Sequence, residues 1–113
     1  MIRIKRAYDP PAPEDGVRVL VDRLWPRGLR KAEARIDWWA RELAPSTELR
    51  TWFGHDPAKY EAFVRRYRDE LAGSEALDRL RALADAGETV TLVYAARDEA
   101  HNNAQALRAL LTS

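Results

Sequence analysis

The chain has 113 residues, 46% of them hydrophobic and 33% charged, with a formal net charge of +1 at pH 7. This length suffices for one domain with its own core, and the composition is that of a globular protein rather than a disordered one. The balance of 19 basic and 18 acidic residues argues against a protein that mainly coats nucleic acid, although a local basic patch remains compatible with it. The chain has no cysteine, which excludes disulfides, thiolate nucleophiles and metal–thiolate centres.

Sequence features also bear on the compartment. No apolar stretch approaches the roughly 20 residues that a membrane-spanning helix needs. Residues 1–6 lack the apolar segment of a signal peptide and begin instead like a strand. We therefore expect a cytoplasmic protein without a membrane partner.

Two strands are predicted in the first part of the chain. Residues 2–6 alternate apolar and basic side chains, which is typical of a half-exposed strand. Residues 7–16 are rich in proline and end in Asp-Gly, so we expect a loop there. Residues 17–21 are β-branched and almost continuously apolar, which indicates a central strand covered on both faces. Pro26 and Gly28 then stop any regular element.

Residues 32–43 fit two interpretations, because Ile36, Trp38 and Trp39 suit either a short strand or a helix. Helix signals become clear after that. Ser46 can cap a short helix that runs through Phe53.

Residues 56–87 hold two amphipathic helices. Asp56-Pro57 combines an N-cap with a proline at the first helical position. The helix that follows carries apolar side chains at helical spacing, namely Tyr60, Phe63, Val64, Tyr67 and Leu71. Gly73 closes this helix, and Ser74 caps the next, which ends at Gly87.

The last two elements are a strand and a helix. Residues 89–94 form the second strand that is largely apolar and expected to be buried, and a final helix is expected from about Asp98, its N-cap, to Leu111. Strands separated by long helical stretches imply parallel pairing through crossovers. The sequence therefore predicts a single α/β domain over residues 1–113, layered, with a mostly parallel sheet flanked by helices.

Polar clusters follow both apolar strands, at the edge of the sheet where ligands bind in parallel α/β folds. Asp22, Arg23, Trp25 and Arg27 follow the first strand. The second strand ends in a larger set, made up of Tyr94, Arg97, Asp98, His101, Asn102 and Asn103. If the two strands are neighbours, these groups converge into one pocket.

Guanidinium groups beside a helix N-terminus are typical of a site for phosphate or carboxylate. Arg23, Arg27 and Arg97 are the candidate clamp, with Asn102 as a hydrogen-bonding neighbour. His101 is the candidate acid or base, since histidine is the residue type most often used in that role near neutral pH.

Each of these residues also has a structural interpretation. Asp22 can act as a general base or hold the arginines in place. Trp25 can stack on a planar ligand or simply pack over the sheet edge. Asp98 can be only a helix cap.

A second polar group lies mid-chain. Arg50 and His55 have no local structural explanation and can line the far wall of the pocket. His55 and His101 are far apart in the chain, so we predict no metal. The chain also lacks the glycine-rich dinucleotide and phosphate-binding motifs, and we predict no cofactor.

Several blocks in order resemble the YeaO-like family of small bacterial proteins, also described as domain of unknown function 488. These blocks are Val21–Gly28, Leu43–Ser46 with Leu49-Arg50 and Trp52-Phe53, His55–Pro57, Phe63, Arg66-Tyr67, Glu70-Leu71, and Leu92–Asp98 with His101-Asn102 and Ala104. Arg97 stands where lysine is expected, and Asn103 stands where histidine is common. The resemblance implies a compact α/β domain with a polar cleft, and it carries over no catalytic residues.

Three functions fit the sequence. The first is an enzyme acting on a small phosphate- or carboxylate-bearing substrate, with His101 and Asp22 in acid–base roles. The second is a non-catalytic module that binds a nucleotide or, less favoured, nucleic acid. The third is a structural protein whose four tryptophans form a contact surface. The oligomeric state is not predicted.

Overall fold

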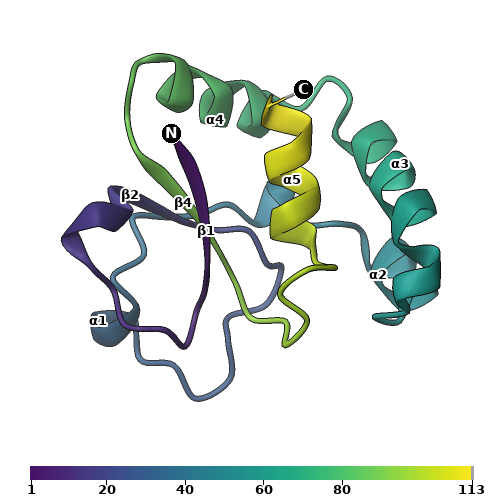
Figure 1. The fold of residues 1–113 in the computed structure, drawn as a ribbon, viewed down its shortest axis with the longest axis horizontal. Coiled ribbons are helices and arrows are strands. Elements are labelled where there is room, and N and C mark those ends of the chain that lie inside the picture. The colour runs from purple at the N-terminus through teal and green to yellow at the C-terminus, as the bar shows by residue number, and fades with distance from the viewer. Residues whose placement is uncertain (113) are drawn as a thin grey trace.

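The computed structural model describes residues 1–112 and contains one four-stranded sheet in the order β1-β4-β2-β3 (Figure 1). Its strands are β1 (Ile2–Arg6), β2 (Val17–Leu20), β3 (Trp38–Trp39) and β4 (Val90–Tyr94). All neighbouring strands pair in parallel. The layered α/β fold predicted from the sequence is therefore confirmed, and the sheet is parallel throughout.

The two largely apolar strands, β2 and β4, lie side by side in the middle of the sheet. β2 pairs with β4 in a register that sets Leu20 opposite Val93. β4 inserts between β1 and β2, whereas β3 is added on the outer side of β2. The strand order thus reverses next to β2 and β4, and ligands bind beyond the carboxyl ends of strands at such points.

Four helices pack on one face of the sheet (Figure 1). They are α2 (Thr47–Phe53), α3 (Tyr60–Leu71), α4 (Glu75–Asp85) and α5 (Asn103–Thr112). The core between the layers joins Val19 and Leu92 of the sheet to Phe63, Tyr67 and Leu107 of the helices, all at most 1% exposed. The apolar stripe predicted for α3 is the face that this core buries.

Loops cover the opposite face. Leu20 and Val93 pack there beneath half-buried side chains from the segment that follows β2, namely Trp25, Leu29, Ile36 and Trp39. The same segment contains the four-residue helix α1 (Lys31–Ala34). Central strands covered on both faces explain why the sequences of β2 and β4 are almost continuously apolar.

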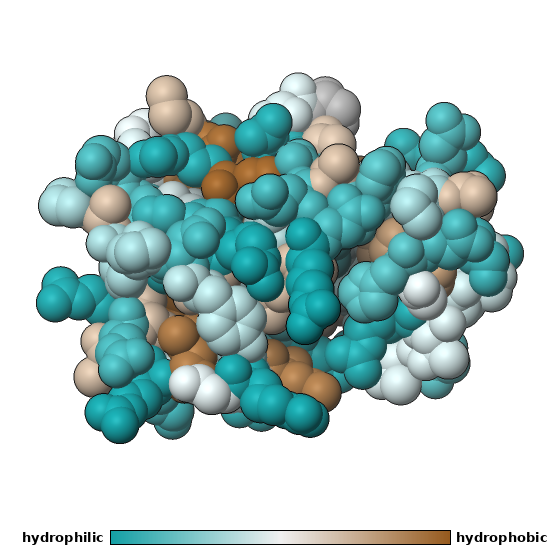
Figure 2. Space-filling view, turned by 60° about the horizontal axis from the view of Figure 1, so that its bottom comes forward, coloured by the Kyte–Doolittle hydropathy of each residue, from teal (hydrophilic) through white to brown (hydrophobic). Residues whose placement is uncertain are grey.

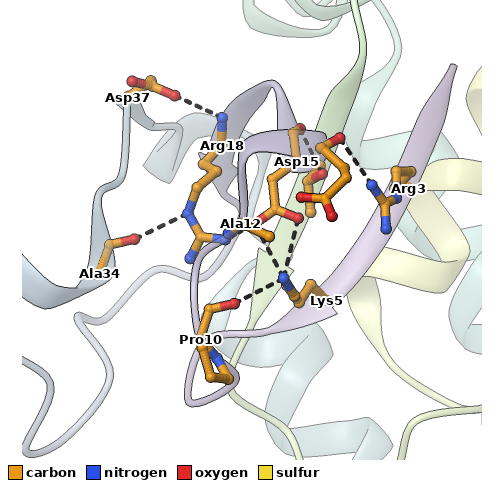
Figure 3. Close-up of polar contacts among 10 residues, drawn as sticks. Arg3, Lys5, Pro10, Ala12, Asp15, Arg18, Ala34 and Asp37 are labelled. Carbon is orange, nitrogen blue, oxygen red and sulfur yellow. Dashed lines mark hydrogen bonds and ion pairs between the residues drawn. The ribbon is translucent and has the colours of Figure 1, made fainter.

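A buried ionic cluster fixes the loop between β1 and β2 to this second face (Figure 3). Asp15 accepts hydrogen bonds from Arg18 Nη1 at 2.6 Å and from Lys5 Nζ at 3.1 Å. Burial alone would raise the pKa of Asp15, but the hydrogen bonds from the Ala12 amide, Lys5 and Arg18 hold it below its ordinary value. Arg18 Nε also donates to the Ala34 carbonyl at 3.0 Å, so the cluster ties the α1 segment to β2.

The ambiguous residues 32–43 prove to contain both kinds of element. α1 ends at Ala34, Trp38 and Trp39 form β3, and a 3₁₀ turn occupies Arg41–Leu43. The two tryptophans pair with β2, so the strand interpretation is correct for them.

The helix caps lie at the residues that the sequence predicts, with one exception. Ser46 and Ser74 cap α2 and α4 as predicted. The prediction that Asp98 caps the last helix is wrong, because α5 begins at Asn103 and the Asn102 side chain accepts from the Gln105 amide at 2.8 Å. Asp98 Oδ1 instead accepts hydrogen bonds from the amides of Ala100 and His101, in the turn that precedes α5. Within residues 1–112, no helix combines the length and the apolarity needed to cross a membrane.

Candidate functional site

A cavity of about 610 Å³ lies at the carboxyl edge of the sheet, bounded by the ends of β2 and β4, by α2 and by the start of α5. Its lining comes from residues 22, 24–27, 44–45, 50–51, 53, 55, 63, 95–96 and 102–103. Figure 2 views the molecule with this end turned forward, and the surface there is largely hydrophilic with apolar atoms visible in its recesses. The two polar clusters that follow β2 and β4 thus meet, as the sequence predicts for neighbouring strands.

Asp22 lines the cavity and joins three segments. Its Oδ2 accepts from the Ala95 amide at 2.9 Å, and its Oδ1 accepts from Asn103 Nδ2 at 3.0 Å. Its backbone carbonyl accepts from Trp39 Nε1 at 2.8 Å. Burial raises the pKa of the Asp22 carboxyl, while the two hydrogen bonds and the positive charge of Arg50 oppose that rise. The carboxylate is therefore held by an amide and an asparagine rather than by an arginine clamp.

Two asparagines begin α5 beside this carboxylate. Asn102 is buried, caps the helix and donates from Nδ2 to the Asp98 carbonyl at 2.9 Å. Asn103 Nδ2 donates both to Asp22 and to the Val21 carbonyl, which fixes the start of α5 to the end of β2. Asn103 lines the cavity, as expected for a member of the polar cluster that follows the second apolar strand, although it is not among the predicted ligand-binding residues. Its signal was its position next to Asn102 in the first turn of a helix.

Arg27 and Arg50 are the arginines that line the cavity. Within residues 1–112 neither has an ion-pair partner. The other two predicted arginines are exposed and lie outside the lining. Of these, Arg23 reaches the Pro45 carbonyl at 3.4 Å. The pocket thus gathers Arg27 and Arg50, and Arg23 and Arg97 remain at its margin.

The two histidines differ in position. His55 is exposed, lines the cavity and adopts a left-handed backbone conformation with φ of 57°. His101 is not among the lining residues. Its Nδ1 lies 3.0 Å from Asp98 Oδ2, and its ring meets Tyr60 edge-on at 5.1 Å. The candidate acid–base pair of His101 and Asp22 is therefore not assembled in one cavity.

Aromatic side chains form the apolar part of the lining. Trp25 is half-buried, packs edge-to-face on Trp39 at 5.4 Å and donates from Nε1 to the Leu29 carbonyl. Phe53 stacks on Phe63 at 4.4 Å, and both are buried. Trp25 therefore packs over the sheet edge while still bordering the cavity. The phenylalanines belong to the core and also form a wall of the cavity, a second role that residue spacing alone does not reveal.

The remaining candidates are a metal site and a tryptophan surface. No three His, Asp or Glu side chains in the described part of the chain are grouped so that they can hold a metal ion. The four tryptophans are half-buried and divide between the two core clusters, Trp38 and Trp52 against one and Trp25 and Trp39 against the other. Arg79 covers Trp38, Arg41 covers Trp39, and Arg66 covers Trp52, with guanidinium carbons 3.7–4.2 Å from the ring centroids.

Comparisons with known proteins identify the family. A family model described as the inactive DUF488-N3 subclade matches residues 1–113. A Mycobacterium tuberculosis H37Rv protein named Uncharacterized protein Rv3073c is 44% identical over 97% of this chain and 92% of its own length. Uncharacterized protein YeaO of Escherichia coli K12 is 41% identical over 99% of this chain and 97% of its own. No solved structure gives a significant match. The chain is thus a member of the inactive DUF488-N3 subclade, within the YeaO-like group that its sequence blocks indicate.

Proposed function

We propose that this chain is a cytoplasmic binding domain that holds a small anion of the nucleotide class without transforming it. The observation that carries the proposal is the lining of the cavity, where Arg27 and Arg50 stand unpaired within residues 1–112 beside aromatic walls. A cavity of about 610 Å³ falls in the ordinary range of small-molecule sites.

The charges of the lining favour an anion. Asp22 is its one acidic side chain among the described residues, and both of its oxygens already accept hydrogen bonds. Burial raises its pKa, so its negative charge is less stable than that of an ordinary aspartate. Arg27 and Arg50 can each give two parallel hydrogen bonds to a phosphate.

The apolar lining suits the planar part of such a ligand. Trp25 and Pro26 border one side, and the stacked rings of Phe53 and Phe63 form a rigid wall. Aromatic walls bury a flat ring at little entropic cost, since packing already fixes their own rotamers. A planar ring that carries a phosphate can therefore contact the aromatic side chains with its ring and the arginines with its phosphate.

Two observations favour binding over catalysis. The His101 ring is engaged by Asp98 and Tyr60 and is not part of the lining, and the Asp22 oxygens are occupied. An acid–base catalyst must reach the proton that it transfers. The description of the family as an inactive subclade supports the same conclusion.

Calorimetric titration with adenosine 5′-monophosphate tests the proposal. We expect saturable binding that Arg50→Gln weakens about tenfold or more, because hydrogen bonds to charged groups are the strong ones. Arg65→Gln is the matched control, since Arg65 is exposed on α3 and is not in the lining. Adenosine, which lacks the phosphate, should bind more weakly, and the nucleotide should be recovered unchanged.

Three outcomes contradict the proposal. The first is an absence of binding, and the second is an equal loss in the Arg50 and Arg65 variants. The third is conversion of the nucleotide into a product, which would restore the enzyme hypothesis.

A further inference from the structure

One segment beside the cavity is rich in exposed cations. Residues 23–35, here called the basic segment, contain five cationic side chains and one acidic one. All five cations are exposed, namely Arg23, Arg27, Arg30, Lys31 and Arg35. Within residues 1–112 the one ion pair of the segment joins Arg30 to Glu33 at 3.9 Å, with both side chains largely in solvent. A solvent-exposed ion pair of this kind offsets little of the positive charge of the segment. The segment is therefore a strongly positive patch on a chain whose net charge is only +1.

Packing makes this patch a fixed platform rather than a loose loop. Trp25 and Leu29 are half-buried against the second face of the sheet, and the Trp25 indole donates back to the Leu29 carbonyl. The buried Arg18 side chain donates a hydrogen bond from Nε to the Ala34 carbonyl, which fixes the C-terminal end of this segment. The cations are thus presented by a backbone that is already ordered, which lowers the entropic cost of binding a partner.

Exposed apolar side chains accompany the charges. Leu24 is 63% exposed and Tyr8 is 46% exposed. The Tyr8 hydroxyl donates to the Arg27 carbonyl at 2.9 Å, so the ring lies against the basic segment. The Arg6 guanidinium lies 5.4 Å from the centroid of the same ring. An open aromatic ring between cations is the arrangement on which unpaired bases stack while their phosphates meet positive charge.

The basic segment also leads into the cavity, since residues 24–27 belong to both. We propose that the basic segment binds a single-stranded nucleic acid whose backbone follows the cations and of which one nucleotide enters the cavity. This deepens the proposed function, on which it rests, because it assigns the bound nucleotide to a strand. A single strand fits better than a duplex, since stacking on Tyr8 and entry into the cavity both need unpaired bases. An acidic protein surface would match the charge but would use neither the ring nor the cavity.

Fluorescence anisotropy with a labelled oligothymidylate of about 12 nucleotides tests the proposal. With about four phosphates neutralised, the logarithm of the affinity should fall against the logarithm of salt concentration with a slope of roughly −3. A variant with Arg30, Lys31 and Arg35 all changed to Gln should bind more than tenfold more weakly at low salt, with a slope flatter by about 2. It should bind adenosine 5′-monophosphate like the unaltered protein, because none of the three residues lines the cavity.

A charge-matched control separates the patch from net charge. The control changes Arg65, Arg68 and Arg108 to Gln, three exposed residues on α3 and α5. We expect it to keep nearly full affinity for the oligonucleotide. An equal loss in both triple variants, or the absence of a salt-dependent interaction, would overturn the proposal.

The ring provides a second and milder test. Tyr8→Ala should lower oligonucleotide affinity about tenfold, whereas Tyr8→Phe, which keeps the ring and loses the hydroxyl, should retain most of it. Equal losses in the two variants would show that the hydrogen bond to Arg27 matters and the stacking does not, which contradicts the inference.

The two proposals fail separately. If the mononucleotide binds but the oligonucleotide binds no more tightly, the strand inference is wrong and the proposed function stands. If the oligonucleotide binds through the basic segment while the mononucleotide does not and Arg50→Gln has no effect, the proposed function is wrong. Tighter binding of an acidic peptide of equal charge than of the oligonucleotide would assign the patch to a protein partner and overturn the inference.

Discussion

At the residue scale, Asp22 connects segments that are far apart in the chain. Its carboxylate receives the Ala95 amide at the end of β4 and the Asn103 side chain at the start of α5. Its carbonyl receives the indole of Trp39, the last residue of β3. The contacts of the carboxylate fix two borders of the cavity, because Ala95 and Asn103 both belong to its lining, so Asp22 organises the site even though both of its side-chain oxygens are occupied.

The raised pKa of Asp22 predicts a pH dependence of stability. Below its ordinary pKa of 3.8, Asp22 is protonated in the folded and the unfolded chain. As pH rises, the unfolded chain releases the proton first, so the stability contributed by the neutral carboxyl is lost as pH rises through the folded-state pKa. Asp22→Asn does not titrate, so its stability relative to that of the unaltered protein should improve between about pH 4 and pH 7.

Urea unfolding across that pH range measures this difference. At neutral pH, Asp22→Asn should still cost about 1–3 kcal/mol, because an amide cannot accept from both the Ala95 amide and Asn103. Asp85→Asn, at an exposed position at the end of α4, should change the free energy of unfolding by less than about 0.5 kcal/mol. Parallel stability curves for Asp22→Asn and the unaltered protein would contradict the prediction.

At the element scale, Ser46 joins two helices that frame the cavity. Its Oγ accepts from the Leu49 amide, which caps α2, and donates to Glu70 Oε2 on α3. Its amide donates to the other oxygen of Glu70 at 2.8 Å. The cap thus also attaches the start of α2, which supplies Arg50, to the end of α3.

Ser46→Ala should therefore cost more than an ordinary cap. We expect a loss of about 2 kcal/mol, because the helix cap and the hydroxyl bond to Glu70 disappear together. Ser74→Ala is the control, since the Ser74 side chain caps α4 through the Leu77 amide, and it should cost about 1 kcal/mol. Urea unfolding measures both values. A larger loss at Ser74 would contradict this account.

Gly16 marks the place where β2 starts against β4. Its φ is +62°, and a Cβ built on it would lie 2.2 Å from the backbone oxygen of Thr89, which also accepts from the Val17 amide. Gly16→Ala should therefore separate the central strands and lower stability by more than about 3 kcal/mol. Gly73→Ala has a similar positive φ of 77° but open space around it, and it should cost only about 1 kcal/mol. Thermal unfolding distinguishes the two, and equal losses would show that strain rather than the clash decides.

At the scale of the whole molecule, the sequence predicts the architecture well because its two apolar strands are unambiguous. Their continuous apolar character follows from burial on both faces, and their position side by side explains why the polar clusters after them converge. The caps at Ser46 and Ser74 are equally local signals. The start of α5 was misplaced because Asp98 and Asn102 both have cap chemistry, and only the turn between them decides which one caps the helix.

The site was harder to predict than the fold. Arg50 and His55 are predicted site residues only because no local structural role accounts for them in the sequence. Both line the cavity. His101 is predicted as an acid or base from the chemistry of its side chain. Its position, however, depends on its contact with Tyr60 of α3, which is distant in the sequence. Phe63 belongs to the predicted apolar stripe, and helical spacing does not reveal that it also borders the cavity together with Phe53. Long-range packing, rather than local pattern, accounts for each of these differences.

The central claim is that the cavity at the carboxyl edge of the sheet holds a nucleotide. Backbone amide NMR shifts during titration with adenosine 5′-monophosphate test it most directly. We predict saturable shifts within residues 22–27, 50–55 and 95–103, the segments that supply most of the cavity lining, and none along α4. An unchanged spectrum at millimolar nucleotide, or shifts confined to α4, would contradict the account.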